Sequence, residues 1–320
     1  MDDRFAIRRA AIFAELDKTL ESAGENGRII CERPTAVAAQ FAQPDSIPAE
    51  PKSDPGRHSV PRRTVGDPAR VALVPLQFSL RTQQIMNLTK PIVTDVPVLT
   101  ASECDRVRDA VQGVRADWIS RSLEVPFYTL GAASYLDARN YAGYQELLKR
   151  QNPMLRENFS WLYERLEAHL SEELGAPASC TTRLALPGFN IFLYSKVFEK
   201  PMASVHIDTQ YLFHDWTGRD ADLANPVSFT VSITLPHTGG GLNTWDICQS
   251  EMKARSTEKF GDVLRGRPIA YHAYKRGCMA VHSGHLLHQA APGRDLAPGD
   301  ERITFQGHGV LAGGVWELYW

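Results

Sequence analysis

The segments GCMAVHSGHLLHQ (277–289) and RITFQGHGV (302–310) decide the fold class of the second half of this chain. In each, a short run rich in apolar and β-branched residues is bounded by glycine or proline, which is typical of strands joined by turns. No long helical pattern separates them. The pair therefore predicts a β-sandwich or barrel and argues against a parallel, doubly wound sheet, in which helices would alternate with the strands.

Runs of the same kind begin soon after Gly175, whereas the sequence before it is mainly helical in pattern. The predicted fold class is therefore α+β, with an N-terminal helical layer and a β unit of about eight strands. The individual runs that predict strands are TTRLAL (181–186), FNIFLYSK (189–196), ASVHIDTQY (203–211), VSFTVSITL (227–235), PIAYHAY (268–274), CMAVHS (278–283) and RITFQGHGV (302–310).

Two helices are predicted ahead of the β unit. Thr100 and Glu103 form a capping box, in which each side chain accepts a hydrogen bond from the other residue's backbone N–H, and they predict a helix through 104–119. Apolar residues at helical spacing predict a second helix over 141–174, interrupted at Pro153 because proline lacks a backbone N–H. We expect both helices to support the β unit.

The N-terminal part of the chain differs from the rest. Apolar residues over 3–22 fall on one helical face and predict an amphipathic helix, and the proline-rich stretch 33–70 predicts a linker or an extended arm. Compact structure is expected to begin with a strand at Val71. The predicted organisation is a helix and arm over 1–70 and one domain over 71–320, with helical support over about 100–175 and a β core over about 180–320.

The composition is that of an ordinary globular protein: 320 residues, 43 % hydrophobic, with a net charge of −2. This charge supplies no general field for nucleic acid or an anionic membrane, so neither is expected as a partner. The five cysteines are scattered without a CxxC pair, which favours a reducing compartment. The N-terminus lacks a signal-peptide pattern and no apolar run is long enough for a membrane span, so we expect a cytoplasmic location.

The most informative local pattern is His206-x-Asp208. On a strand, residues i and i+2 point to the same face, so this imidazole and this carboxylate can converge on one ion. His288 follows eighty residues after Asp208, and Arg302 lies fourteen residues further on. Two histidines and one carboxylate form the facial triad of non-haem Fe(II) sites, and an arginine can bind a carboxylate through two parallel hydrogen bonds.

In order and spacing these residues resemble the 2-oxoglutarate and Fe(II)-dependent oxygenases, most closely the prolyl-hydroxylase-like branch. Tyr194, twelve residues before His206, is similar to the tyrosine of that branch's opening strand. HTGGGLNTW (237–245) is similar to its GG-x-L strand entry, and Lys-Arg-Gly (275–277) resembles the lead-in to the distal histidine. The resemblance covers about 180–312.

The resemblance implies a double-stranded β-helix core, also called a jelly-roll or cupin-like core. It implies that His206, Asp208 and His288 hold Fe(II), with 2-oxoglutarate as cosubstrate, O₂ as oxidant and ascorbate as an accessory reductant. The cosubstrate contacts it implies are Arg302 with the C5 carboxylate, Thr304 on the same strand face as an assisting residue, and Tyr194 as a further hydrogen-bond donor.

Alternatives remain for the distal ligand and for the arginine. His282 and His285 are both close to His288, but a packed strand position suits the first and a turn position the second, and the Leu-Leu-His-Gln order at His288 matches the family best. Arg294 lies only six residues past His288 in a proline- and glycine-rich turn. Arg302 is preferred because a strand would hold its guanidinium still.

The predicted function is hydroxylation or desaturation of an unactivated C–H bond in an amino-acid, peptide or secondary-metabolite substrate, with succinate and CO₂ as coproducts. The carboxylate of Asp208 favours these outcomes, because halogenating relatives replace it with a small residue. Two alternatives are a cupin-type metal-dependent hydrolase or isomerase using the same ligands, and a noncatalytic β-barrel binding module. Arg302 favours the oxygenase, since a hydrolase needs no dicarboxylate clamp.

Overall fold

The structure, a computed structural model, describes residues 92–181, 183–247, 251 and 263–320. The predicted helix over 3–22, the proline-rich arm over 33–70 and the strand predicted from Val71 all lie outside these residues. Within the described ranges, no helix combines the length and the apolar character that a membrane-spanning segment requires.

Of the described residues, those from 92 to 174 are mainly helical and those after 174 are mainly β-structured. The described helices are α2 (Ala101–Gly113), α3 (Ser134–Asp137) and α4 (Tyr141–Leu174), with 3₁₀ turns at Arg115–Asp117, Lys196–Glu199 and Gln210–Phe213. The strands are β1 (Thr94–Pro97), β2 (Ile119–Ser120), β3 (Phe127–Leu130), β4 (Ala178–Cys180), β5 (Gly188–Leu193), β6 (Ala221–Thr234), β7 (Leu242–Trp245), β8 (Ala270–His272), β9 (Cys278–Ser283), β10 (Leu287–Ala290), β11 (Glu301–Ala312) and β12 (Val315–Tyr319).

The strands form two sheets. The main sheet has the order β1-β9-β6-β11-β5-β3-β2, with β12 and β4 continuing from β11, and the small sheet has the order β10-β7-β8. Every ladder is antiparallel except that between β12 and β4. From β6 to β11 the chain passes back and forth between the sheets, which is the winding of a double-stranded β-helix. The predicted α+β class with a jelly-roll core is confirmed.

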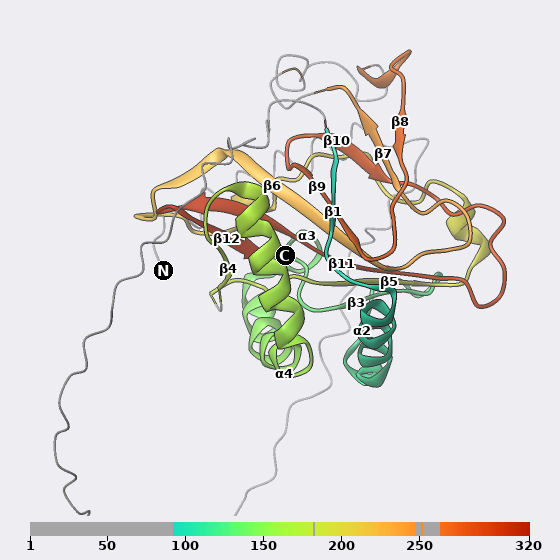
Figure 1. Ribbon diagram of the computed structural model, residues 1–320, viewed down its shortest axis with the longest axis horizontal. Helices are drawn as coiled ribbons and strands as arrows, with labels where there is room; N and C mark the ends of the chain where they lie inside the picture. Colours follow the sequence, from blue (N-terminus) through green and yellow to red (C-terminus); the bar gives the residue numbers. More distant parts are fainter. Residues whose placement is uncertain (1–91, 182, 248–250, 252–262) are drawn as a thin grey trace, which may run out of the picture. The chain divides into compact units, whose positions relative to one another are not determined.

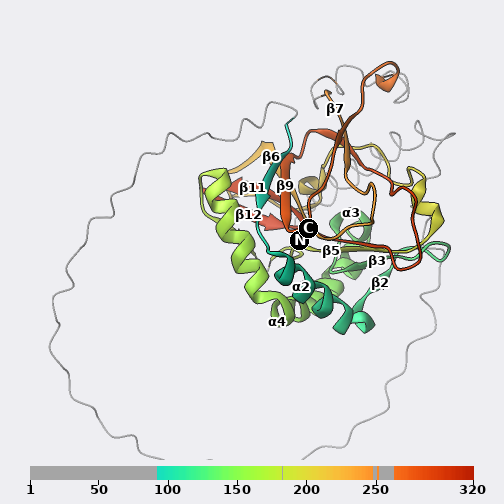
Figure 2. The same cartoon turned by 45° about the vertical axis from the view of Figure 1, so that its right-hand side comes forward.

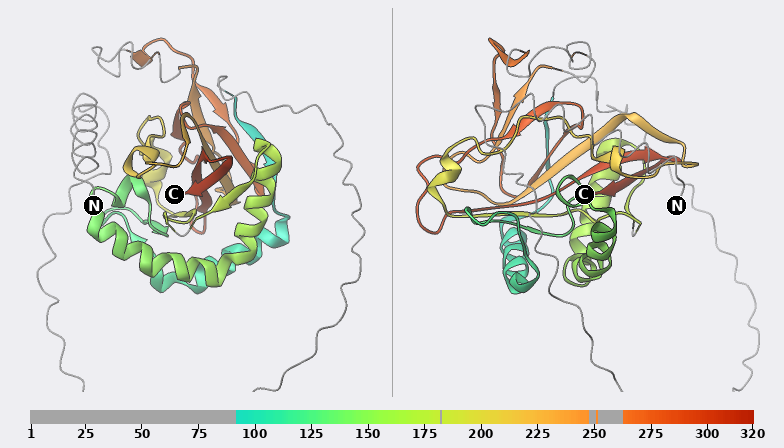
Figure 3. Two further views of the ribbon diagram at one scale, coloured as in Figure 1. Left: turned by 90° about the vertical axis from the view of Figure 1, so that its left-hand side faces the viewer. Right: turned by 180° about the vertical axis from the view of Figure 1, so that it is seen from behind.

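Helices α2 and α4 cover the main sheet on the face turned away from β7, β8 and β10 (Figure 1). The view from the side shows α4 as a curved band beneath the strands (Figure 3), and the turned view shows β6, β9 and β11 next to one another (Figure 2). The main apolar core forms between these helices and the sheet, and includes Phe159 and Tyr163 of α4 with Phe189 and Phe305 of the sheet.

Alternation along β11 separates the core from the site. Ile303 and Phe305 are fully buried in the core that the helices cover, whereas Thr304 and His308 are buried polar residues outside that core. Because side chains on a strand point alternately to opposite faces, Arg302 shares the second face with Thr304 and His308. The sheet therefore has one apolar face toward the helices and one polar inner face toward the small sheet.

Both predicted helices are present, but their observed course differs from the predicted one. The capping box of Thr100 and Glu103 is formed, but α2 ends at Gly113 rather than at 119, and a 3₁₀ turn and β2 follow. Helix α4 continues through Pro153, so the predicted interruption there is wrong. Its irregular residue is Phe159, next to Asn158, whose side-chain amide donates to the Met154 carbonyl within the helical ladder.

Two strand predictions are wrong, and several strands were not predicted. Of the run 181–186, the described residues 181 and 183–186 form no strand, because the side chain of Asn152 in α4 binds the backbone of Leu184 and Leu186 in place of a neighbouring strand. Residues 203–211 contribute one isolated bridge and then a 3₁₀ turn. The strands without a counterpart among the predicted runs are β1, β2, β3, β4, β7, β10 and β12.

Candidate metal centre

His206 and Asp208 lie on an irregular segment beside the beginning of β10, not on the predicted strand. The backbone of His206 makes a reciprocal pair of 2.9 Å hydrogen bonds with His288, and the N–H of Asp208 donates to the Gly284 carbonyl at 2.7 Å. Strand β10 and the turn before it thus fix the positions of His206 and Asp208 through backbone hydrogen bonds. These backbone contacts therefore bring the two side chains to one side of the segment, for which the sequence had predicted a continuous strand.

The side chains of His206, Asp208 and His288 converge. One Asp208 oxygen, Oδ1, lies 3.6 Å from Nε2 of His206, and the other, Oδ2, lies 3.6 Å from Nε2 of His288. One ligand atom from each residue lies within 4.8 Å of the other two. Among the described residues, this is the group of histidine, cysteine and acidic side chains that could hold a metal ion. Two imidazoles and one carboxylate suit a non-haem Fe(II) centre with open coordination positions.

Hydrogen bonds orient both imidazoles for metal binding. Nδ1 of His206 lies 3.0 Å from the Ser204 carbonyl, and Nδ1 of His288 lies 2.8 Å from the Leu286 carbonyl. A carbonyl oxygen can only accept, so each Nδ1 carries the hydrogen and each Nε2 presents a lone pair. This assignment of tautomers directs both lone pairs toward the carboxylate of Asp208.

The electrostatics of the centre favour the ligand forms. Burial alone would raise the pKa of Asp208, but the surrounding histidines, His288 first, hold it well below its usual range. Burial lowers the pKa of His288 to about 3, although Asp208 opposes this shift. At neutral pH the carboxylate is therefore ionised and the imidazole of His288 is neutral, which are the forms that bind a metal.

The alternative histidines have other contacts. Nε2 of His285 lies 3.0 Å from the hydroxyl of Tyr211, so this nitrogen points to a hydrogen bond rather than to the carboxylate. His282 is buried on β9, with its ring centroid 4.9 Å from that of His288 and its Nδ1 bonded to the Ser283 carbonyl. Neither belongs to the converging group.

Arg302 lies in a buried aromatic setting at the start of β11. Its guanidinium carbon is 5.8 Å from the ring centroid of Phe192 and 5.5 Å from that of Tyr274. It donates long, 3.5 Å hydrogen bonds to the carbonyls of Ala291 and Gly241, and its buried Nε has no partner. No carboxylate of the described residues forms an ion pair with it. Burial lowers its pKa, yet an arginine stays charged in proteins.

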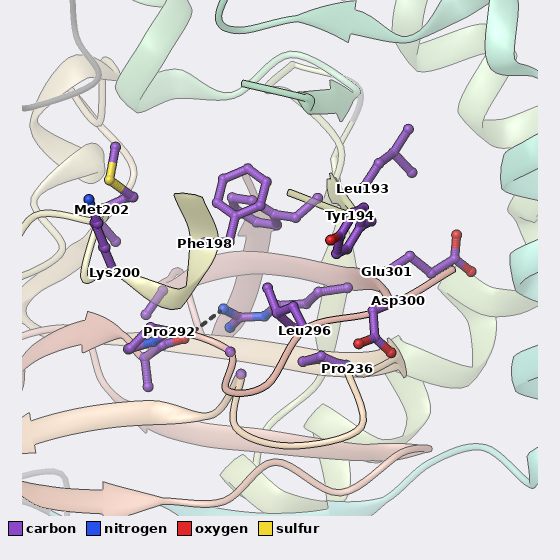
Figure 4. A pocket seen from close by; sticks show the side chains of 17 residues that line it. Leu193, Tyr194, Phe198, Lys200, Met202, Pro236, Pro292, Leu296, Asp300 and Glu301 are labelled. Carbon is purple, nitrogen blue, oxygen red and sulfur yellow. Dashed lines mark hydrogen bonds between the residues drawn. The ribbon is translucent and has the colours of Figure 1, made fainter. Parts of the chain in front are cut away.

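Arg302 is one of the residues that line a mainly apolar hollow, which Figure 4 shows from close by. Tyr194, Phe198 and Leu296 are among its lining residues, and Ala290, two residues beyond His288 on β10, is another. Tyr194 therefore lines the same hollow as Arg302, as a cosubstrate role would require. The alternative arginine, Arg294, has an exposed side chain.

Thr304 is buried on the inner face and its hydroxyl donates to the Gln306 side chain at 3.3 Å. Three further residues at the centre were not predicted. Tyr274 packs against Arg302, and both Ser228 and Gln210 donate hydrogen bonds to Asp208, at 2.6 and 3.2 Å. Gln210 could have been noticed as the next alternate residue after Asp208. The contact of Ser228 depends on strand register, and that of Tyr274, which follows β8, depends on the assembled fold; no local pattern reveals either.

Fold and geometry together define a two-histidine, one-carboxylate centre inside a double-stranded β-helix, with a partly buried arginine on the inner face of the main sheet. No protein-family model matches the chain, and no curated protein matches it. Solved structures do.

An N-substituted L-amino acid dioxygenase from Burkholderia ambifaria AMMD is 14 % identical with a TM-score of 0.42, over 70 % of this chain and 85 % of that one. HygX from Streptomyces hygroscopicus, with nickel and 2-oxoglutarate bound, is 13 % identical with a TM-score of 0.38, over 69 % and 83 %. A Pseudomonas putida prolyl-4-hydroxylase is 12 % identical with a TM-score of 0.31, over 71 % and 92 %. The functional case rests on the centre of this chain itself.

Proposed function

We propose that this protein is a non-haem Fe(II) and 2-oxoglutarate-dependent dioxygenase that hydroxylates or desaturates an unactivated C–H bond. The observation that carries the proposal is the guanidinium of Arg302, whose buried Nε has no hydrogen-bond partner and which forms no ion pair with a carboxylate of the described residues. A buried charge is costly unless it is paired. A dicarboxylate cosubstrate supplies the missing partner, and the centre formed by His206, Asp208 and His288 supplies the metal that such a cosubstrate chelates.

The donor set fits iron. His206 and His288 each present a neutral Nε2 lone pair, and Asp208 presents an ionised carboxylate. Three protein ligands on one side of a six-coordinate ion leave positions for a bidentate 2-oxo acid and for O₂. When bound, the iron would supply the redox chemistry with O₂. In that chemistry the cosubstrate is oxidised to succinate and CO₂ while the substrate is oxidised. The protein supplies ligand geometry and a shielded site.

The inner face of β11 provides the cosubstrate contacts. Arg302 would bind the C5 carboxylate through two parallel hydrogen bonds, which a guanidinium fork makes better than an ammonium group. The rings of Phe192 and Tyr274 lie close to the guanidinium and limit the directions in which it can turn. Thr304 and Tyr194 are the proposed additional hydrogen-bond donors to the cosubstrate.

The reaction type and the substrate class follow from the same residues. The carboxylate of Asp208 fills the position that a halogenating enzyme would leave for a halide, so hydroxylation or desaturation is proposed. The substrate is proposed to be an amino acid, a peptide or a secondary metabolite, since a net charge of −2 provides no attraction for a polyanion.

The proposal is tested by cosubstrate turnover. Protein loaded with Fe(II) should convert 2-oxoglutarate to succinate when O₂ is admitted, slowly without substrate and faster when a true substrate is added. The His206→Ala variant is the control that lacks one ligand. Binding of Zn²⁺ or Mn²⁺ with no succinate formed under any condition would favour the cupin-type hydrolase or isomerase instead.

A further inference from the structure

A hydrogen-bonded chain links the inner face of the main sheet to the carboxylate of Asp208. The hydroxyl of Ser228 donates to Oδ2 of Asp208 at 2.6 Å, and Nδ1 of His308 lies 3.1 Å from the same hydroxyl oxygen. All three side chains are buried, with exposed fractions of 6 % for Asp208, 4 % for Ser228 and 7 % for His308. Water therefore does not compete for these contacts, and each must be satisfied within the chain.

The chain has one possible direction. An ionised carboxylate only accepts hydrogen bonds, so the single hydrogen of the Ser228 hydroxyl goes to Asp208. The hydroxyl oxygen can then receive a hydrogen only from His308, which must carry it on Nδ1. Donation runs from His308 to Ser228 to Asp208, and the tautomer of His308 is set by this requirement.

The two donors lie on neighbouring strands in the interior of the main sheet. Ser228 on β6 and His308 on β11 are directly opposite each other in the ladder, and β6 also pairs with β9. Asp208, by contrast, lies on an irregular segment. The other side-chain donor to Asp208, Gln210, belongs to that same segment and cannot tie it to the sheet.

We propose that Ser228 and His308 are positioning residues for the metal ligand Asp208. They fix the rotation of its carboxylate relative to the imidazoles of His206 and His288 before a metal arrives. This inference rests on the metal centre of the proposed function and adds two residues that act on it through Asp208. Outer hydrogen-bond partners of metal ligands typically change metal affinity by about 10- to 100-fold.

The test is Co²⁺ binding to the metal-free full-length protein, followed by visible absorption under anaerobic conditions. Ser228→Ala should bind Co²⁺ about 10- to 100-fold more weakly than the unaltered protein, with an altered absorption spectrum. Ser228→Thr keeps the hydroxyl and should restore affinity. Ser232→Ala is the matched control. It removes a buried serine hydroxyl that lies four residues beyond Ser228 on the same face of β6, and that hydroxyl has no hydrogen-bond partner. It should bind Co²⁺ normally.

Substitution of His308 tests the direction of the chain. In His308→Asn the side-chain amide can donate from nearly the same place as Nδ1, whereas His308→Leu cannot donate at all. The Asn variant should therefore retain more Co²⁺ affinity than the Leu variant, and this comparison stands even if Ser228→Ala does not fold. Equal affinities of Ser228→Ala and the unaltered protein, or of the two His308 variants, would overturn the inference. Failure of the unaltered protein to bind Co²⁺ would instead contradict the proposed metal centre.

Discussion

Replacing Arg302 by methionine should separate cosubstrate binding from folding. Methionine has a similar length and no charge, and it can pack between the rings of Phe192 and Tyr274. A charge-assisted hydrogen bond contributes about 1.5 to 3 kcal/mol. Losing two such bonds to the C5 carboxylate would therefore cost about 3 kcal/mol or more, which corresponds to on the order of 100-fold weaker binding of 2-oxoglutarate.

The same substitution should not destabilise the metal-free protein. Arg302 has a buried Nε without a partner and only two long hydrogen bonds to backbone carbonyls, so its charge is poorly compensated in the absence of a dicarboxylate. Removing an uncompensated buried charge relieves a desolvation penalty. The thermal unfolding temperature of Arg302→Met should thus equal or exceed that of the unaltered protein.

Calorimetric titration of the Mn²⁺-loaded protein with 2-oxoglutarate, with O₂ excluded, measures the first quantity, and thermal unfolding followed by circular dichroism measures the second. Arg302→Lys should bind with intermediate affinity because it keeps the charge but loses the two-pronged geometry. The reasoning is refuted if Arg302→Met binds 2-oxoglutarate normally, or if its unfolding temperature falls by several degrees, since the arginine would then serve the fold.

Two further predictions concern the distal histidine and the surface of the main sheet. His288→Ala should lose metal binding by at least about 100-fold, whereas His285→Ala should keep it; a Co²⁺ titration decides, and the reverse result would reassign the ligand. Burial opposes ionisation of Asp95, but hydrogen bonds from Lys275 and His272 lower its pKa overall. The contribution of Asp95 to stability is therefore fully present above its unfolded pKa of about 3.9, and it is lost as the pH falls through the lower folded pKa. Asp95→Asn should therefore lower the unfolding temperature at pH 7, by an amount equivalent to no more than about 1 kcal/mol, and the difference should shrink toward pH 3; a constant difference would show another cause.

The order of chemistry-bearing residues could be predicted from the sequence because it is local. His206 and Asp208 are two residues apart, and His288 follows a recognisable strand and turn. Their convergence did not require the predicted strand. A reciprocal backbone pair between His206 and His288 achieves it, and such a pair is invisible until the two segments are placed side by side.

Other features depend on contacts between distant residues. The run 181–186 has the composition of a strand, yet Asn152 of α4 takes up its backbone groups. Ser228 reaches Asp208 only because β6 pairs with β9 and β11 in one particular register. A shift of that register by one residue would turn the side chain of Ser228 toward the core. Tyr274 lies just after β8 and meets Arg302 of β11 only in the assembled fold. Such residues need the assembled sheet before their roles can be inferred.

The roles of Tyr194 and Thr304 stay predictions. The structure places Tyr194 beside the hollow that Arg302 borders and Thr304 on the inner face, but the hydroxyl of Thr304 bonds to Gln306. A bound cosubstrate would have to draw that hydroxyl away. Single substitutions, Tyr194→Phe and Thr304→Val, measured for 2-oxoglutarate affinity, separate the two contributions.

The most direct test of the central claim is the visible spectrum of the protein loaded with Fe(II) in the absence of O₂, before and after addition of 2-oxoglutarate. Chelation of iron by the 2-oxo acid at a centre with three protein ligands should produce a weak charge-transfer band that saturates at one cosubstrate per chain. Arg302→Met should require far more 2-oxoglutarate to reach the same band. Tight binding of Fe(II) with no band at any 2-oxoglutarate concentration would contradict the assignment.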